Sequence, residues 1–215
     1  MTVLVTGYEP FGDHESNPSA AVARRLDGET VADREVVGRV VPVAFDRTRD
    51  ELVSLVDEHD PVVVVSTGLA GGRSAVSVER VGVNVDDHAG VPDNDDATPR
   101  HERIDGDGPD AYFSTLPVPA VVADLNDAGI PARLSNTAGT HLCNHALYTV
   151  RAYVEREGLG VSSGFVHLPY SPAMAARRAA DGEAESGGSV PPSMSLDLQT
   201  EAVERVLATT LGSRP

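Results

Sequence analysis

The sequence predicts a single-domain α/β protein, a three-layer α/β/α sandwich with a mostly parallel or mixed central sheet. Three observations lead to this prediction. Continuous β-branched runs at 2–6 and 61–65 are typical of buried strands. Apolar strand-like and helix-like patterns alternate along the chain, without an internal repeat or a break in composition. The length of 215 residues suits one hydrophobic core, so we expect residues 1–215 to form one domain.

Strand and helix patterns alternate through the first part of the chain. Apolar runs predict strands at 2–6, 36–43 and 61–65. Asn17 is expected to be the N-cap residue of a first helix, because a proline follows it at the first helical position. Asp46 is expected to cap a second helix, since the leucines and valine that follow it share one face.

The second part continues this alternation around three irregular segments. The glycine-rich stretch 66–72 is expected to be a flexible turn, and the Asp-, Gly- and Pro-rich stretch 86–110 a long loop. Gly, Ser and paired prolines predict a mobile excursion at about 179–192. The remaining elements are expected to be strands over 76–85, 132–135 and 164–170 and helices over 119–126, 140–157 and 196–211.

Charge and cysteine content exclude several classes of protein. The formal net charge is -16 and all 17 basic residues are arginine, so nucleic acid and anionic membranes would be repelled. No stretch is apolar for long enough to span a membrane, and no basic segment of a signal peptide is present, so we expect a cytoplasmic protein. A single cysteine excludes an intramolecular disulfide and a Cys-based zinc module. The acidic surface fits an acidic interaction protein or, as the favoured reading, a halophilic organism with a salt-rich cytoplasm.

Cys143 is a candidate nucleophile. A lone free cysteine is more often a small buried apolar side chain. Here, however, Ala138-Gly139-Thr140 precedes the cysteine and a helical pattern follows it. Cys143 is therefore expected in the first helical turn, where free backbone amides and the helix dipole favour a thiolate.

A reactive thiol needs a base, and His167 is the candidate. It lies near the carboxyl end of an apolar strand, the end at which open α/β sheets bind ligands. The alternative is a buried core histidine, which would also need a polar partner. Glu79 could be that partner, because its neighbour Arg80 points to the opposite face of the strand. With Cys143 these residues would form a set of nucleophile, base and orienting anion.

Other chemistries receive less support from the sequence. His141, Cys143 and His145 resemble a metal-binding motif. Residues at that spacing cannot converge from one helix, however, since each residue turns the helix by about 100°. The glycines of 68–72 lack the following Lys-Ser/Thr of a phosphate loop. We therefore expect no metal and no other cofactor. A non-catalytic small-molecule binding module with an incidental cysteine is the main alternative to an enzyme.

Taken together, these residues resemble the pyroglutamyl peptidase I (pyrrolidone-carboxylate peptidase) family of cytoplasmic cysteine peptidases. The matching blocks occur in the right order over most of the chain, a far more specific signal than a single motif. They are 5–12 with 17–19, 70–73, 78–81 with Asn84, 92–94, 137–140 with Cys143-Asn144, 164–167, and 193–196.

The resemblance implies a role for each member of the trio. Cys143 would be the nucleophile, His167 the base and Glu79 the third member. It further implies that the enzyme removes an N-terminal 5-oxoproline (pyroglutamate) from peptides without a cofactor, on an α/β/α fold, as a homotetramer.

The resemblance also implies that aromatic residues enclose the lactam ring, at the positions of Tyr8, Phe11 and His141. The family usually has Phe or Tyr at His141 and commonly Phe at Tyr8. It also commonly has Ala at Gly82 and Arg at Gly90. Because the trio itself is unchanged, these departures bear on ring affinity and selectivity rather than on the reaction.

Overall fold

The structure is a computed structural model that describes residues 1–88, 90–180 and 190–213. Its strands are β1 (Thr2–Tyr8), β2 (Thr30–Val31), β3 (Arg34–Val41), β4 (Val63–Leu69), β5 (Val76–Glu79), β6 (Val81–Val83), β7 (Ala111–Phe113), β8 (Ala132–Ser135) and β9 (Ser162–Leu168). Its helices are α1 (Pro18–Leu26), α2 (Phe45–His59), α3 (Val118–Asp127), α4 (Leu142–Arg156), α5 (Pro172–Arg178) and α6 (Leu196–Gly212).

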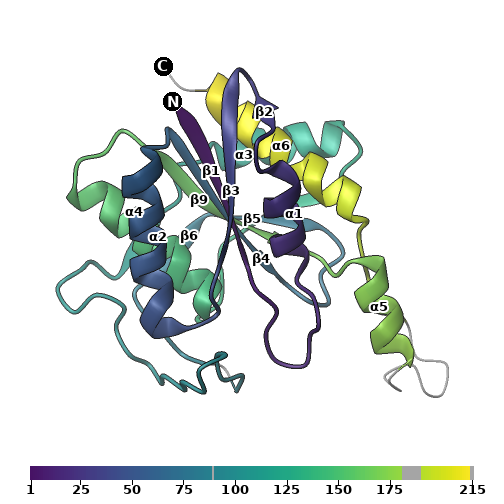
Figure 1. Cartoon of the computed structure of the whole chain (residues 1–215), viewed down its shortest axis with the longest axis horizontal. Coiled ribbons are helices and arrows are strands. Elements are labelled where there is room, and N and C mark those ends of the chain that lie inside the picture. Colours follow the sequence, from purple (N-terminus) through teal and green to yellow (C-terminus); the bar gives the residue numbers. More distant parts are fainter. Residues whose placement is uncertain (89, 181–189, 214–215) are drawn as a thin grey trace.

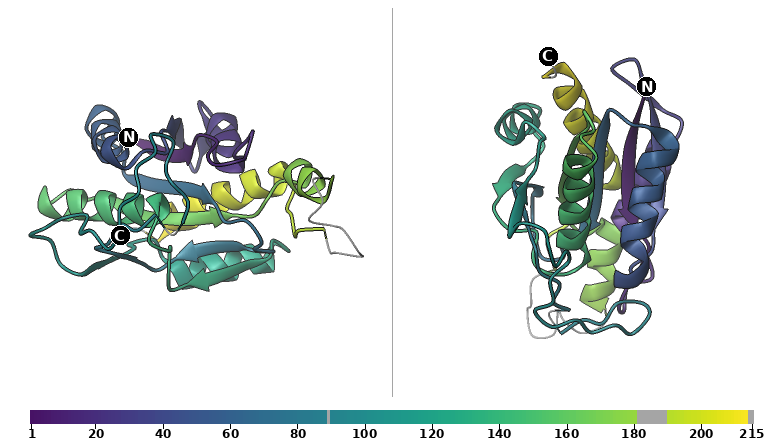
Figure 2. Two further views of the ribbon diagram at one scale, coloured as in Figure 1. Left: turned by 90° about the horizontal axis from the view of Figure 1, so that it is seen from below. Right: turned by 90° about the vertical axis from the view of Figure 1, so that its left-hand side faces the viewer.

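A mixed sheet forms the middle layer, with the strands in the order β2-β3-β1-β4-β9-β5-β8. Helices α2 and α4 pack on one face of this sheet, and α1, α3 and α6 pack on the other (Figure 1). Figure 2 shows the same layers from two further directions. The predicted three-layer α/β/α sandwich with a mostly parallel sheet is therefore confirmed.

The carboxyl ends of four neighbouring strands meet at one edge of the sheet. Strands β3, β1, β4 and β9 run parallel to one another, whereas β5 is antiparallel to β9. In Figure 1 this edge is at the bottom, where the chain segments 9–17 and 86–110 also lie. A site at this edge can thus draw residues from strands, from these segments and from the start of a helix.

The two predicted helix caps have different outcomes. Asn17 caps α1 as expected, since its Oδ1 accepts a hydrogen bond from the Ser19 amide at 3.1 Å. The prediction for Asp46 is wrong, because α2 begins at Phe45 after Ala44. Here the Phe45 amide donates to Asp93 Oδ2 at 2.8 Å. This carboxylate comes from segment 86–110, so a purely local reading of the sequence could not find it.

Two predicted segment boundaries are also wrong. Residues 66–69 continue β4 instead of forming a turn, because they pair in register with residues 165–168 of β9. The strand predicted over 76–85 breaks at Arg80 into β5 and β6, and β6 pairs with β7 in a separate small sheet. Strands β2 and β7 and helix α5 were not predicted. The other predicted elements are present, with their ends shifted by a few residues at most.

Two further expectations concern a mobile excursion and a membrane span. The excursion predicted over 179–192 falls mostly on 181–189, which lies outside the described residues, so it stays a prediction. Among the helices that the structure describes, none combines the length and apolarity needed to cross a bilayer.

Candidate active site

The three candidate residues lie at the carboxyl edge of the sheet, on the face that α4 covers. Along β9, His167 shares a face with Phe165, whose ring packs in the core beneath α2 and α4. Cys143 is the second residue of α4. Gly68 of β4 pairs with His167, and a Cβ atom added at Gly68 would lie only 2.8 Å from Cys143 Sγ. The thiol therefore rests directly against the strand beside His167.

Glu79 orients His167 through a short hydrogen bond. His167 Nδ1 donates to Glu79 Oε1 at 2.7 Å, which leaves Nε2 as the nitrogen that can exchange a proton. Both side chains are buried, with 0% of Glu79 and 4% of His167 exposed. The partner arginine of Glu79 is Arg73, whose Nη1 donates to the same Oε1 at 2.9 Å, and not the adjacent Arg80.

Burial controls the protonation of this site. It lowers the pKa of His167, and the hydrogen bond to Glu79 offsets this only in part. Burial also raises the pKa of Cys143 to about 12, and the charge of Glu79 acts in the same direction, whereas Arg73 opposes it. For Glu79, burial favours the neutral acid, but the hydrogen bond and the charge of His167, together with smaller effects of Ser135 and Arg73, outweigh it and lower the pKa.

The resting site thus contains a neutral thiol, a neutral imidazole and a charged carboxylate. The helix dipole by itself would favour a thiolate, but desolvation by burial and the charge of Glu79 raise the pKa of the thiol and keep it protonated. A neutral thiol needs a base to take its proton before it can act as a nucleophile.

The first turn of α4 is held by one buried amide side chain. Asn144 accepts from the Val83 amide at 2.8 Å and donates to the carbonyls of Val83 and Val85 at 2.9 and 3.0 Å. The N-cap residue His141 makes no side-chain hydrogen bond to this turn. First-turn amides next to Cys143 are therefore available to bind an oxyanion.

Tyr8, Phe11 and His141 come together in a small pocket next to Cys143. The rings of Phe11 and His141 stack at 6.4 Å with an angle of 28°. The Tyr8 hydroxyl donates to the Leu142 carbonyl at 2.7 Å. The complete lining is Tyr8, Phe11, Asn17, Val43, Leu69, His141, Leu142 and Cys143. The cavity measures only about 20 Å³, room for about one water molecule, so a five-membered ring can enter only when these walls move apart.

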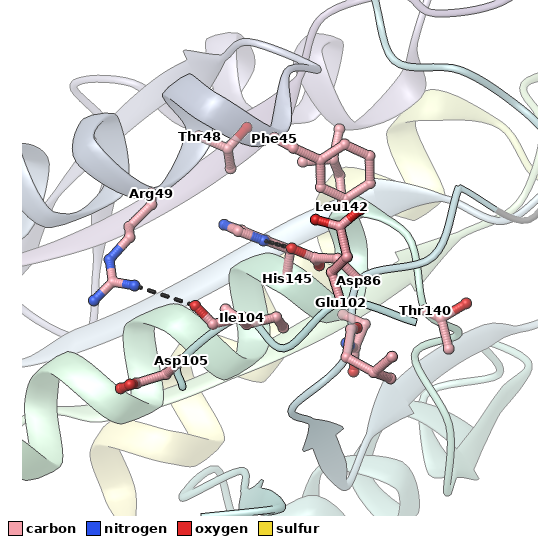
Figure 3. Close-up of polar contacts among 12 residues, drawn as sticks. Phe45, Thr48, Arg49, Asp86, Glu102, Ile104, Asp105, Thr140, Leu142 and His145 are labelled. Atoms are coloured by element: carbon pink, nitrogen blue, oxygen red, sulfur yellow. Dashed lines mark hydrogen bonds and ion pairs between the residues drawn. The ribbon is translucent and has the colours of Figure 1, made fainter. Parts of the chain in front are cut away.

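A second buried histidine–carboxylate pair joins α4 to the segment that begins at Asp86 (Figure 3). His145 Nδ1 donates to Asp86 Oδ2 at 2.8 Å, and both residues are buried. The Phe45 ring contacts both His141 and His145 edge-on, at 5.1 and 5.9 Å. His141 in turn bonds through Nε2 to the Val91 carbonyl at 3.0 Å. The segment that begins at Asp86 is therefore attached to the pocket wall at both histidines.

The three members of the His-x-Cys-x-His sequence have separate partners in the structure. His141 bonds to Val91, His145 bonds to Asp86, and Cys143 lies against Gly68. Across the described part of the chain, no three His, Cys, Asp or Glu side chains are grouped as metal ligands.

Sequence reasoning missed several residues that shape this site. Arg73 stood inside a recognised block, 70–73, but was given no role. Gly68 was assigned to a turn, and no local signal marks it as the residue beneath the thiol. Val43 and Leu69 line the pocket without being predicted, because apolar residues next to strand ends read as core.

A thiol in the first turn of a helix, a histidine oriented by a buried carboxylate and an adjoining aromatic pocket define a cysteine hydrolase on an α/β fold. Comparison with known proteins identifies the family. The chain belongs to the pyroglutamyl peptidase family, whose model matches residues 1–212. It is accordingly a hydrolase, a peptidase of the cysteine type.

Named relatives and solved structures agree with this assignment. A pyrrolidone-carboxylate peptidase from Cupriavidus pinatubonensis is 45% identical and covers 99% of this chain and 94% of that protein. One from Pyrococcus furiosus is 40% identical and covers 98% of each chain. The crystal structure of a mutant pyrrolidone carboxyl peptidase from P. furiosus superposes with a TM-score of 0.94 at 40% identity, over 100% of both chains. That from Thermococcus litoralis gives 0.92 at 38% identity, over 98% of this chain and 93% of the other.

Proposed function

We propose that this protein hydrolyses the amide bond that follows an N-terminal pyroglutamyl residue, with Cys143 as nucleophile, His167 as base and acid, and Glu79 as orienting anion. The observation that carries the proposal is the 2.7 Å bond from His167 to Glu79 at the carboxyl edge where Cys143 also lies. The substrate class rests on the relatives, which are named as pyrrolidone-carboxylate peptidases.

The first half of the reaction forms an acyl-enzyme. His167 Nε2 takes the proton from Cys143 Sγ as the sulfur attacks the carbonyl carbon that joins pyroglutamate to the next residue. First-turn amides of α4 receive the developing oxyanion, a contribution typically worth about 3–4 kcal/mol. The imidazolium, stabilised by Glu79, then gives its proton to the leaving amine, and the C–N bond breaks.

The second half releases pyroglutamic acid. His167, neutral again, removes a proton from a water molecule, which attacks the thioester carbonyl. Collapse of this second tetrahedral intermediate breaks the C–S bond, and the sulfur recovers its proton from His167. No step needs a cofactor. Every proton transfer passes through His167 Nε2, because Nδ1 is held by its hydrogen bond to Glu79.

The pocket beside Cys143 accounts for the proposed selectivity. Its mostly apolar and aromatic lining, which includes Tyr8 and the stacked rings of Phe11 and His141, suits a flat, uncharged lactam. A free α-amino group would be a cation, and burying it in this lining would cost desolvation without a carboxylate to compensate. The enzyme should therefore reject peptides whose first residue is an uncyclised glutamine or glutamate with a charged α-amino group.

Matched aminoacyl amides test this function. The wild-type enzyme should release the fluorophore from a pyroglutamyl amide and leave the glutaminyl and prolyl amides intact, in high salt. A non-catalytic binding module would bind pyroglutamate without any turnover. Equal rates on the prolyl and pyroglutamyl amides would contradict a lactam-specific pocket.

The histidine at position 141 gives a pH-dependent affinity. Burial lowers the pKa of His141 from its ordinary 6.5, so the ring is neutral at pH 7 and gains a proton only at lower pH. A cation against an uncharged lactam is poorly solvated, so KM should rise as the pH falls below that ordinary value. His141→Phe should lose part of this rise in KM while keeping the acid limb of kcat. If the KM–pH curves of the two enzymes superimpose, His141 does not contact the ring.

We also propose a salt-rich cytoplasm as the setting of this enzyme, and a homotetramer as its working form. The support is the net charge of -16, together with the family resemblance for the tetramer. Molar salt shortens the Debye length to about 3 Å and screens repulsion within and between subunits. The melting temperature should therefore rise from low to molar potassium chloride, and light scattering should show a tetramer at molar salt. A melting temperature that falls with salt would contradict the halophilic reading.

A further inference from the structure

One oxygen of Glu79 accepts two hydrogen bonds from two different cations or potential cations. Oε1 accepts from His167 Nδ1 at 2.7 Å and from Arg73 Nη1 at 2.9 Å. Oε2 has no hydrogen-bond partner among the described residues, since the nearby Ser135 hydroxyl is donated to the Thr137 carbonyl. The arginine therefore acts on the same oxygen that orients the imidazole.

The turn that carries Arg73 is shaped for this contact. It follows β4, and the Arg73 amide closes it on the Ala70 carbonyl at 3.3 Å. Gly72 has φ +81, in the left-handed region that favours glycine. A Cβ atom at Gly71 would lie 2.3 Å from the Tyr170 hydroxyl, so only glycine lets the turn pack against Tyr170. Both glycines thus serve to place the Arg73 backbone beside Glu79.

We propose that Arg73 is a positioning residue of this site, which keeps the buried Glu79 carboxylate charged and aimed at His167 Nδ1. The inference rests on the proposed roles of Cys143, His167 and Glu79. A carboxylate with 0% exposure needs a compensating charge. His167 is neutral in the resting site, so Arg73 is the group that supplies a permanent one.

Arg73 also sets the electrostatic balance of the site. Its charge favours the loss of a proton from both Cys143 and His167, so it lowers the pKa of each. The other charges that act on them are Glu79 from β5, which acts in the opposite direction on both, and Arg133 from β8, which acts on His167. Removing Arg73 should therefore raise the pH at which the Cys143–His167 couple becomes reactive.

Arg133 provides a matched control. It is a second arginine close to His167, but its Nε donates to Ser77 Oγ at 3.1 Å and it makes no bond to Glu79. Arg133→Gln removes a nearby positive charge and leaves the Glu79 contacts intact. The comparison thus separates the specific contact of Arg73 from a general effect of charge.

The experiment compares wild type, Arg73→Gln, Arg73→Lys and Arg133→Gln by two pH profiles. One profile is kcat/KM on a pyroglutamyl amide, and the other is the rate of alkylation of the thiol by iodoacetamide. Because Cys143 is the single cysteine of the chain, alkylation reports on it alone. Both acid limbs of Arg73→Gln should move up by about one pH unit, and kcat/KM at pH 7 should fall by about 10-fold or more. Arg133→Gln should stay close to wild type.

Arg73→Lys keeps the charge but not the planar fork, so its acid limbs should stay near those of wild type while kcat falls several-fold. Superimposable profiles for Arg73→Gln and wild type would overturn the inference, as would an equal shift in Arg133→Gln. If Arg73→Gln fails to fold, Arg73→Lys decides the matter. A wild-type kcat in Arg73→Lys overturns the inference, and a reduced kcat supports it. Loss of the proposed function itself would look different, since wild type would then show no turnover that depends on Cys143.

Discussion

Replacement of Cys143 by alanine should abolish turnover of a pyroglutamyl amide, with a loss of about 10⁴-fold or more. Without the sulfur no acyl-enzyme can form, and the remaining oxyanion donors and pocket only bind the substrate. Cys143 is partly buried and its truncation removes one atom at the edge of the core, so the melting temperature should change little. Steady-state kinetics and a thermal melt of the same preparation check both expectations. Activity above a few per cent of wild type would rule out the thiol mechanism.

His167→Ala and Glu79→Gln should differ in how much activity they lose. His167→Ala should lose about as much activity as Cys143→Ala, because nucleophile and base act as one unit. Glu79→Gln should be milder, because it can still accept the hydrogen bond from His167 Nδ1 but lacks the charge that stabilises the imidazolium. Unchanged kinetics in Glu79→Gln would reduce Glu79 to a structural partner of Arg73.

Two properties of the resting site connect substrate binding with activation. The pocket has room for about one water molecule, and the thiol and imidazole are both neutral. In the proposed reaction, a lactam that enters this pocket brings a polar carbonyl next to Cys143. The proton can then leave the thiol, because the negative charge that follows is passed at once to an oxyanion bound by backbone amides.

The fold could be predicted from the sequence where the signal was local. The apolar run at 61–65 and the Asn17-Pro18 pair each act through neighbours in the chain, and both predictions were confirmed. The cap of α2 failed because Asp93, almost fifty residues away, supplies the carboxylate. The strand over 76–85 failed because its two halves pair with different sheets, a tertiary choice that residue alternation cannot reveal.

Some residues of the candidate site could also be predicted from the sequence and others could not. Cys143, His167 and Glu79 could be found because each is a chemically unusual residue in an otherwise apolar element. Their roles stay proposals, although the geometry brings all three to one edge of the sheet. Arg73 could not be paired with Glu79 in advance, since the turn that carries it was read as flexible. The residue alternation along the strand argued only against Arg80 as a partner of Glu79, and it named no other arginine.

Gly68 is the clearest case of a residue whose importance only the three-dimensional arrangement shows. It was assigned to a glycine-rich turn, yet it lies inside β4 and pairs with His167. A Cβ atom there would lie 2.8 Å from Cys143 Sγ and 2.8 Å from Phe165 Cζ. The sulfur is the end of a mobile side chain and can swing away, whereas the Phe165 ring is fully buried and cannot yield without disturbing the core.

Gly68→Ala should therefore displace the thiol and cost stability at the same time. Overpacking of this kind typically costs about 1–3 kcal/mol. A shift of the nucleophile by about 1 Å can lower kcat/KM by about 100-fold. Gly106→Ala is the matched control, because no atom lies within 4 Å of the added Cβ atom and its φ is not positive. It should leave both the melting temperature and the kinetics of wild type unchanged. If Gly68→Ala proved as active as Gly106→Ala, the thiol would not rest against β4, and the close approach that places it beside His167 would have to be abandoned.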